Sequence, residues 1–198
     1  MSMGDVEFNE NELVSRAAQG DSDAYAVLVR QYQNRLFAAM LAMVNSREDA
    51  EDLTQEALAM GFAKLSSFEG RSSFFTWLHR VACNLAFSHR RKHRKEKSMH
   101  RQSMEAAEAD LQDERETVEV ELDRNRRQAI IRDGIQRLDE DYRAVLVLRD
   151  LQGLGYSEIA DALEIPIGTV RSRLHRARLE LKDILAMLLG SELESESR

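Results

Sequence analysis

The sequence predicts an all-α fold of two small helical domains joined by an acidic linker. The chain of 198 residues has one proline and nine glycines, which leaves few turn residues for a multi-stranded sheet. Apolar residues recur with the period of an amphipathic helix in two separate groups of segments. Between these groups, residues 105–123 hold nine acids, one base and no aromatic residue, a composition typical of a linker.

Composition limits the compartment and the class of protein. The hydrophobic content of 43% is ordinary for a globular chain, and the single cysteine, Cys83, excludes an intramolecular disulfide. The longest apolar runs, such as residues 144–148, are much shorter than the ~20 residues of a membrane span. The N-terminus lacks the basic and apolar segments of a secretory leader. We therefore expect a soluble, cytoplasmic protein without membrane insertion.

The N-terminal domain is expected at residues 12–97, after a tail at 1–11. Helical periodicity is found in the segments 24–41, 48–65 and 74–87. In the third segment, the residues expected in the core are Phe75, Leu78, Val81, Ala82 and Leu85. Residues 71–101 carry nine bases and one acid, although the whole chain has a net charge of −7. Aromatic residues among these bases indicate a surface for unpaired nucleic acid.

The segment SREDAEDLTQEAL forms a second charged surface. Asp52, Gln55 and Glu56 share one helix face through their i, i+3 and i+4 spacing. Such a face fits a solvated helix, a dimetal carboxylate site or a docking surface for a basic protein. The dimetal site needs a Glu-x-x-His pair, and neither Glu48 nor Glu51 has a histidine three residues on. The residues alone do not decide between the other two interpretations.

Histidine and cysteine pairs are the remaining candidate ligands. His79 with Cys83, and His89 with His93, lie four residues apart and therefore on one helix face. No second cysteine or carboxylate pattern completes either pair as a ligand set. We predict no metal site and no cofactor.

The C-terminal domain is expected at residues 125–189, between the linker at 98–124 and a polar tail at 190–198. Helical periodicity is found in the segments 127–138, 141–151 and 157–163. The last of these ends before Pro166, which is accepted at a helix start and poorly tolerated inside a helix. A short helix, a tight turn and a second helix with a basic front predict a helix-turn-helix.

The second helix of this motif has an apolar back and a polar front. At 100° per residue the back consists of Ile167, Val170, Leu174, Ala177 and Leu181. The candidate contacts to double-stranded DNA are Arg149, Thr169, Arg171, Ser172, Arg173, His175 and Arg176. The alternative is that the arginines only solvate a bundle helix. The turn and the small residues at the helix start favour DNA reading.

Three motifs in order, DAEDLTQE, SFEGRSSFFTWLHRVACN and EIADALEIPIGTVRSRLHRAR, resemble those of an extracytoplasmic-function (ECF) sigma factor of bacterial RNA polymerase. The resemblance covers about residues 12–185. It implies that the polymerase-binding residues are Asp49, Asp52, Leu53, Gln55 and Glu56. It assigns contacts with the −10 promoter element to Phe68, Gly70, Arg71, Ser72, Trp77, Arg80, Asn84, Arg91 and Lys92. It assigns contacts with the −35 element to the residues named above as candidate contacts to double-stranded DNA.

The resemblance also implies partners and a role. The partners are core RNA polymerase, through its β′ clamp helices and β flap, promoter DNA in double- and single-stranded form, and an anti-sigma factor. The acidic linker is expected to thread the polymerase cleft. The alternative function is a stand-alone helix-turn-helix regulator, which would have no use for the acidic motif. An enzyme is not expected, because no Gly-rich phosphate loop, activated nucleophile or metal set is visible.

Overall fold

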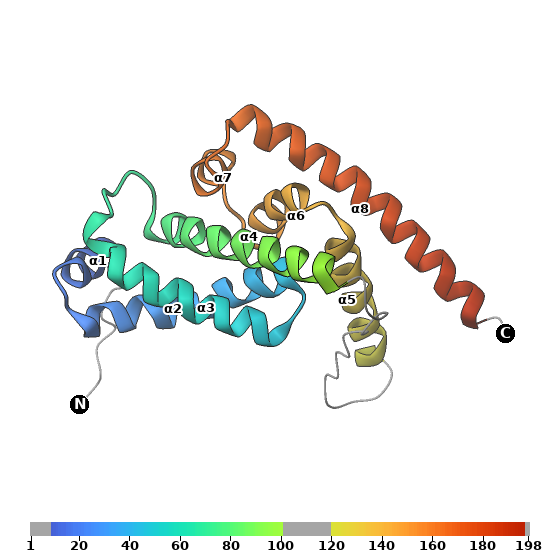
Figure 1. Cartoon of the computed structure of the whole chain (residues 1–198), viewed down its shortest axis with the longest axis horizontal. Coiled ribbons are helices and arrows are strands. Elements are labelled where there is room, and N and C mark those ends of the chain that lie inside the picture. The colour runs from blue at the N-terminus through green and yellow to red at the C-terminus, as the bar shows by residue number, and fades with distance from the viewer. Residues whose placement is uncertain (1–8, 101–119, 197–198) are drawn as a thin grey trace.

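The computed structural model describes residues 9–100 and 120–196, and within them it contains eight α-helices and no strand (Figure 1). The first helical region consists of α1 (Glu10–Ala18), α2 (Ser22–Val44), α3 (Arg47–Lys64) and α4 (Phe74–His100). The second consists of α5 (Val120–Arg137), α6 (Glu140–Leu146), α7 (Tyr156–Leu163) and α8 (Ile167–Glu196). The predicted all-α fold with two helical regions is therefore confirmed.

The first region is built around α2, which packs against α1, α3 and α4. Its start is fixed by Asp21, whose carboxylate accepts hydrogen bonds from two backbone N–H groups of the first turn at 3.0 Å. Gly61 lets α3 approach closely, because a Cβ at this position would lie 2.8 Å from the Tyr25 hydroxyl and 3.1 Å from Leu78. The contact of α3 with Tyr25 and Leu78 therefore leaves no room for a methyl group at Gly61.

Helix α1 begins inside the predicted N-terminal tail. Asn9 caps the helix by accepting a hydrogen bond from the N–H of Glu12. Glu10 then joins three elements, since its carboxylate accepts from the Tyr32 hydroxyl and from the N–H of Phe74. Burial and the Glu10 carboxylate both raise the pKa of Tyr32. Helix α1 therefore begins two residues before the predicted start of the N-terminal domain at residue 12.

Helices extend into both ends of the predicted linker and into most of the predicted C-terminal tail. Helix α4 continues to His100 and α5 begins at Val120, so both ends of the predicted 98–124 linker are helical. Residues 101–119, which carry most of its acids, lie outside the described residues. Helix α8 runs to Glu196, through most of the predicted tail, and residues 191–196 (SELESE) contain three glutamates, one leucine and no proline.

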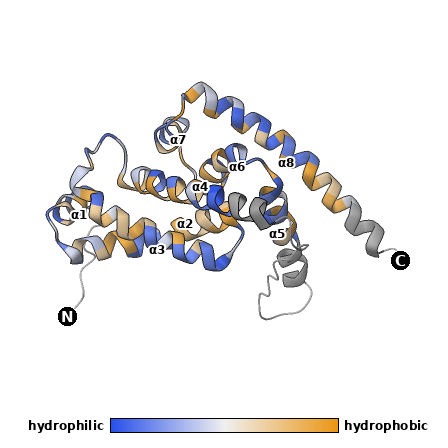
Figure 2. Cartoon of the chain, in the orientation of Figure 1, coloured by the Kyte–Doolittle hydropathy of each residue, from blue (hydrophilic) through white to orange (hydrophobic). Residues whose placement is uncertain are grey.

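In the second region, α6 continues into a π-helical segment, Val147–Leu151, and α7 and α8 fold back over it. Figure 2 shows apolar and polar residues alternating along α8, as expected for a helix with one face on a core. Val170, Leu174 and Ala177 of the predicted apolar back are buried. Ile167 is 43% exposed and stands outside this core, since it is the first residue of the helix.

The two regions pack against each other. Helix α7 lies across α4, and α2 contacts α5 and α6. Gln136 donates a hydrogen bond to the carbonyl of Ala42 at 2.6 Å, and Arg35 donates to the carbonyl of Gln152 at 2.8 Å. The two predicted domains therefore share an interface. Among the described helices, none has the length and apolar character needed to cross a membrane.

Arg143 occupies the centre of that interface. It is 2% exposed, and its guanidinium donates to the carbonyls of Ile135 at 3.0 Å, Leu138 at 2.8 Å and Met43 at 2.9 Å, and also to that of Gln136. A buried guanidinium is tolerated only when its donors are satisfied. Arg143 therefore fixes the turn between α5 and α6 and fastens it to the end of α2.

Candidate functional site

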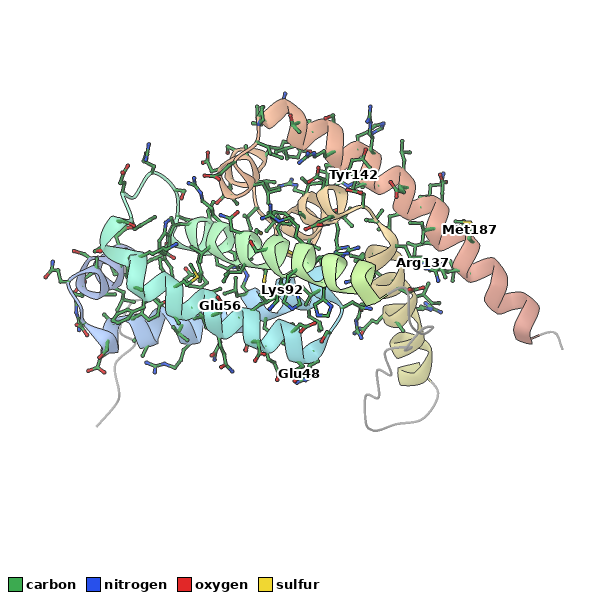
Figure 3. The ribbon with its side chains drawn as sticks, in the orientation of Figure 1. Glu48, Glu56, Lys92, Arg137, Tyr142 and Met187 are labelled. Carbon is green, nitrogen blue, oxygen red and sulfur yellow. The ribbon has the colours of Figure 1, made fainter. Side chains whose placement is uncertain are left out.

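Helix α3 presents an exposed acidic face, formed by Asp52, Gln55 and Glu56. Glu48 and Glu56, both residues of α3, are labelled in Figure 3. The opposite face packs into the core through buried residues, namely Ala50, Leu53, Thr54, Ala57 and Gly61. Leu53, which the resemblance assigns to the polymerase contacts, is 4% exposed; it lies three residues from Ala50 and four from Ala57, on the core side of the helix.

Aromatic side chains gather where α4 begins. The ring of Trp77 lies 5.4 Å from that of Phe68 and 5.9 Å from that of Phe74, centroid to centroid. Trp77 is half-buried, so it packs in this cluster with one edge at the surface. The preceding loop turns at Gly70, whose φ of +68° favours glycine, and it carries the ion pair between Arg71 and Glu69 at 2.6 Å. Ser72 is half-buried in the same loop.

Helix α4 presents a basic face along which Asn84, Arg91 and Lys92 are exposed. Lys92 is labelled in Figure 3. Arg80, at the start of this face, forms an ion pair with Glu164 at the end of α7. Close by, the Thr76 hydroxyl donates to Glu158 at 2.9 Å. Helix α7 thus covers the N-terminal part of the surface that was assigned to the −10 element.

Glu158 also caps the start of α7, where the N-cap residue is a glycine without a side chain. Its other carboxylate oxygen accepts a hydrogen bond from the N–H of Gly155, the N-cap, at 2.7 Å. This is half of a capping box, and it replaces the side-chain cap that glycine lacks. One glutamate therefore holds both the start of the helix-turn-helix and its contact with α4.

The helix-turn-helix is formed by α7 and the first half of α8. Glu164 ends α7 with a left-handed φ of 55°, and α8 begins directly after Pro166. Arg171, Ser172, His175 and Arg176 are exposed on the front of α8, as the helical spacing predicts. Thr169 and Arg173 are half-buried at its edge.

Acidic groups of α6 border this front. Arg173 pairs with Asp141 at 2.5 Å, and a groove beside it is lined by residues of both helices: Asp139, Asp141, Tyr142, Thr169, Ser172, Arg173 and Arg176. Farther along α8, Arg178 pairs with Asp150 at 2.6 Å, and the hydrogen bond to Asp150 raises the pKa of Arg178. These pairs join α8 to α6 and to the π-helical segment that follows it, and they neutralise two bases of α8.

Arg149 is engaged inside its own region. Its guanidinium donates to the carbonyl of Leu154 at 2.7 Å and lies over the ring of Tyr156, 5.0 Å from the centroid. These contacts shape the loop that leads into α7. The predicted phosphate contact at Arg149 would have to form beside this structural role.

His79 and Cys83, one of the two pairs considered as metal ligands, are buried in the core. Burial, assisted by the positive charge of Arg35, lowers the pKa of His79 to about 3. Burial also raises the pKa of the Cys83 thiol to about 12. A neutral imidazole and a protonated thiol of this kind behave as core side chains.

An exposed acidic helix face, a basic helix beside an aromatic cluster and a helix-turn-helix on one all-α chain are features of a transcription factor. Residues 28–96 match the family description "Sigma-70 region 2", and residues 128–181 match "Sigma-70, region 4".

Full-length relatives agree with these matches. The RNA polymerase sigma-H factor of Pseudomonas aeruginosa is 36% identical over 185 residues, which span 91% of this chain and 95% of that protein. The ECF RNA polymerase sigma-E factor of Haemophilus influenzae is 35% identical over 192 residues, spanning 92% of this chain and 98% of that protein. The chain belongs to the sigma-70 family and, within it, to the ECF sigma factors.

Solved structures share the fold. The sigma factor RpoE, in complex with the anti-sigma factor NepR from Bartonella quintana, has a TM-score of 0.66 at 24% identity and covers 82% of this chain and 96% of its own. CnrH, in complex with the cytosolic domain of CnrY, has a TM-score of 0.66 at 21% identity over 90% of this chain and 97% of its own. The family establishes an alternative sigma factor for transcription initiation, and a stand-alone regulator is not favoured.

Proposed function

We propose that this chain binds core RNA polymerase through the acidic face of α3. The observation that carries this proposal is the availability of that face: Asp52, Gln55 and Glu56 are all exposed. Among the described residues, neither Asp52 nor Glu56 forms an ion pair with another side chain. Exposed, unpaired acids on one rigid helix suit a basic docking surface such as the β′ clamp helices, and Asp49 borders the same face.

We infer a second polymerase contact in the C-terminal region, and this inference rests on the family. Leu179, Met187 and Leu189 of α8 are large apolar side chains exposed by 51%, 65% and 48%, and Met187 projects from α8 in Figure 3. Because Met187 and Leu189 lie two residues apart and face opposite sides of the helix, these side chains form no single patch and do not mark a binding surface by themselves. The β flap of the polymerase is the partner that the resemblance gives to this region. The chain would act there as a non-enzymatic subunit, in the cytoplasm with the polymerase.

Two surfaces would read the promoter. The loop at Gly70 to Ser72 and the exposed Asn84, Arg91 and Lys92 of α4 would hold the melted −10 strand, with Phe68 and Trp77 beside them. The front of α8 would enter the major groove at −35, where Arg176 suits a guanine edge and Arg171 a phosphate. Ser172 and His175 would contact neighbouring bases, while Thr169 and Arg173 lie at the margin.

Promoter binding would require the two regions to separate. The −10 and −35 elements lie ~25 base pairs apart, or about 85 Å at 3.4 Å per pair. Arg80, one of the −10 contacts, is held by Glu164 of α7 in the packed arrangement. We infer that α7 leaves α4 when both elements are bound. An anti-sigma factor, like the NepR of the RpoE complex, would act by preventing the two regions from binding the promoter.

The polymerase contact is tested with a triple variant, Asp52→Asn, Gln55→Ala and Glu56→Gln. We expect its affinity for core polymerase to fall at least tenfold, because two exposed acids that face a basic partner are worth about 1.4 kcal/mol or more. The matched control is Glu12→Gln with Asp23→Asn, which removes the same charge from exposed positions of α1 and α2. Fluorescence anisotropy measures both; equal affinity of the two variants would refute the docking surface.

The −35 contact is tested with Arg176→Ala in the assembled holoenzyme. Loss of a bidentate guanine contact costs about 1–3 kcal/mol, or roughly 5- to 150-fold in promoter binding. Lys182→Ala removes an exposed base of the same helix outside the reading front and serves as the control. A gel-shift titration that finds the same small loss in both variants would show that Arg176 adds only charge.

A further inference from the structure

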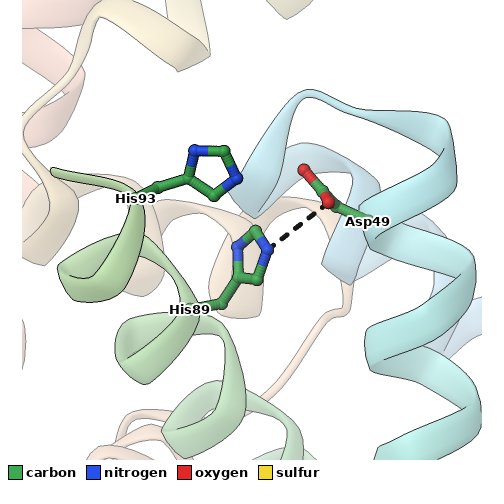
Figure 4. A group of neighbouring side chains, drawn as sticks. All are labelled: Asp49, His89 and His93. Carbon is green, nitrogen blue, oxygen red and sulfur yellow. Dashed lines mark ion pairs between the residues drawn. The ribbon is translucent and has the colours of Figure 1, made fainter. Parts of the chain in front are cut away.

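Three metal-ligating side chains from two helices meet at the border of the acidic face. Asp49 comes from the first turn of α3, and His89 and His93 come from α4 (Figure 4). One ligand atom from each residue lies within 4.8 Å of the others. We propose that these three residues form a binding site for a divalent transition-metal ion, with zinc as its representative.

The distances are close to those that an ion requires. Zinc binds imidazole nitrogen and carboxylate oxygen at about 2.0–2.2 Å, which puts tetrahedral ligand atoms about 3.4 Å apart. The His89 Nε2 to Asp49 Oδ1 distance is already 3.4 Å. The other ligand atoms, within 4.8 Å, need to approach by about 1.4 Å at most, which side-chain rotation supplies.

The two histidines are preorganised by the helix. Residues four apart on a helix stand one above the other, and this His-x-x-x-His spacing is a recurrent zinc-binding arrangement. The ring centroids of His89 and His93 lie 4.9 Å apart with their planes tilted by 47°. Both rings turn toward the carboxylate of Asp49 in Figure 4. The third ligand is thus supplied across the packing of α3 on α4.

No strong hydrogen bond occupies the proposed ligand atom of His89. At 3.4 Å, its Nε2 is farther from Asp49 than a usual N–H···O hydrogen bond. Its other nitrogen, Nδ1, is buried and has no hydrogen-bond partner among the described residues. The ring therefore directs its one accessible nitrogen at Asp49, and a metal ion placed there would replace a long contact with two coordinate bonds.

Access and ligand type fit a transition metal. Asp49 and His89 are half-buried whereas His93 is exposed, so the ion could enter from solvent and keep a water at its fourth position. Two imidazoles with one carboxylate favour zinc, copper, nickel or cobalt over magnesium and calcium, which prefer oxygen. The adjacent Arg90 directs its guanidinium to the carbonyl of Met43 at 3.0 Å, at the end of α2.

The test is a zinc titration of the untagged full-length chain after chelator treatment, followed by calorimetry. We expect one ion per chain, and an affinity at least tenfold weaker in His93→Ala, whose exposed side chain can be removed without opening the core. Asp49→Asn should weaken binding in the same way. His175→Ala, which removes an exposed histidine of α8, is the control and should bind like the parent chain.

A thermal scan provides a second readout. Zinc should raise the unfolding midpoint of the parent chain and of His175→Ala, and it should leave that of His93→Ala unchanged. Absence of stoichiometric binding, or equal binding by the parent and His93→Ala, would overturn the site. Because the assay contains neither polymerase nor DNA, its outcome is independent of the proposed promoter-reading function.

Discussion

Acidification should destabilise this protein through one residue, His79. The side chain is fully buried, with its ring 4.4 Å from that of Phe75, and neither ring nitrogen has a hydrogen-bond partner among the described residues. Its pKa is about 3 in the folded chain, against 6.5 for an ordinary histidine. Between these values the unfolded chain binds the proton and the folded chain does not, so stability is lost as the pH falls below 6.5.

The size of the effect follows from the two pKa values. Between pH 7 and pH 5, protonation of the unfolded chain at His79 lowers the free energy of unfolding by about 2 kcal/mol. In His79→Leu this contribution disappears, and two unsatisfied buried nitrogens are removed as well. The variant should therefore be at least as stable as the parent at pH 7 and lose about 2 kcal/mol less on acidification.

Urea unfolding followed by circular dichroism at pH 5 and pH 7 measures this difference for both chains. The remaining titrating groups are common to both, so they cancel when the two pH-dependent changes are subtracted. Equal losses of stability in the parent and in His79→Leu would refute the reasoning. Such a result would mean that the imidazole is protonated in the folded state or reached by water.

Three further outcomes are expected. Gly61→Ala should lower the free energy of unfolding by about 1–3 kcal/mol, because the added Cβ would lie 2.8 Å from the Tyr25 hydroxyl. Gly190→Ala, which has open space around it, should not destabilise the protein. Equal thermal midpoints of the two variants would contradict the close packing at Gly61. Arg143→Met should cost about 3 kcal/mol or more in urea unfolding, since the carbonyls of Ile135, Gln136 and Leu138 lose the guanidinium donor, whereas that of Met43 keeps Arg90; a neutral effect would show that water replaces the guanidinium. Zinc should weaken polymerase binding by the parent chain, because the bound ion reverses the charge beside the acidic face, and it should not weaken binding by His93→Ala. Fluorescence anisotropy measures both, and an equal response of the two chains would show that the proposed metal site does not influence the acidic face.

Helical periodicity predicted most of the fold, because long amphipathic helices reveal their buried face locally. Spacing predicted the burial of Phe75, Leu78 and Ala82 in α4 and of Val170, Leu174 and Ala177 in α8, whereas the predicted core residues Val81 and Leu85 are half-buried. Helix α1 was missed, since its nine residues carry only a short apolar pattern, although Asn9 with Val14 and Ala17 offered a cap and a partial stripe. A short helix of this kind is held by tertiary contacts rather than by its own sequence.

What the sequence could not predict depends on partners that are distant in the chain. The spacing of His89 and His93 was visible, but Asp49, which completes the cluster, lies forty residues earlier in another helix. The pairing of Arg80 with Glu164 likewise requires the two regions to meet. Leu53 was assigned to the acidic motif by resemblance, whereas its burial follows from the geometry of α3.

The hydrogen bonds of Arg143 are divided unequally between the two regions. Three of its four acceptors belong to its own region, and only the carbonyl of Met43 lies across the interface. That carbonyl also accepts from Arg90 at 3.0 Å, within the first region. If the regions part, as promoter binding is proposed to require, the guanidinium and the Met43 carbonyl each retain partners, so breaking the hydrogen bond between them leaves neither group unpaired.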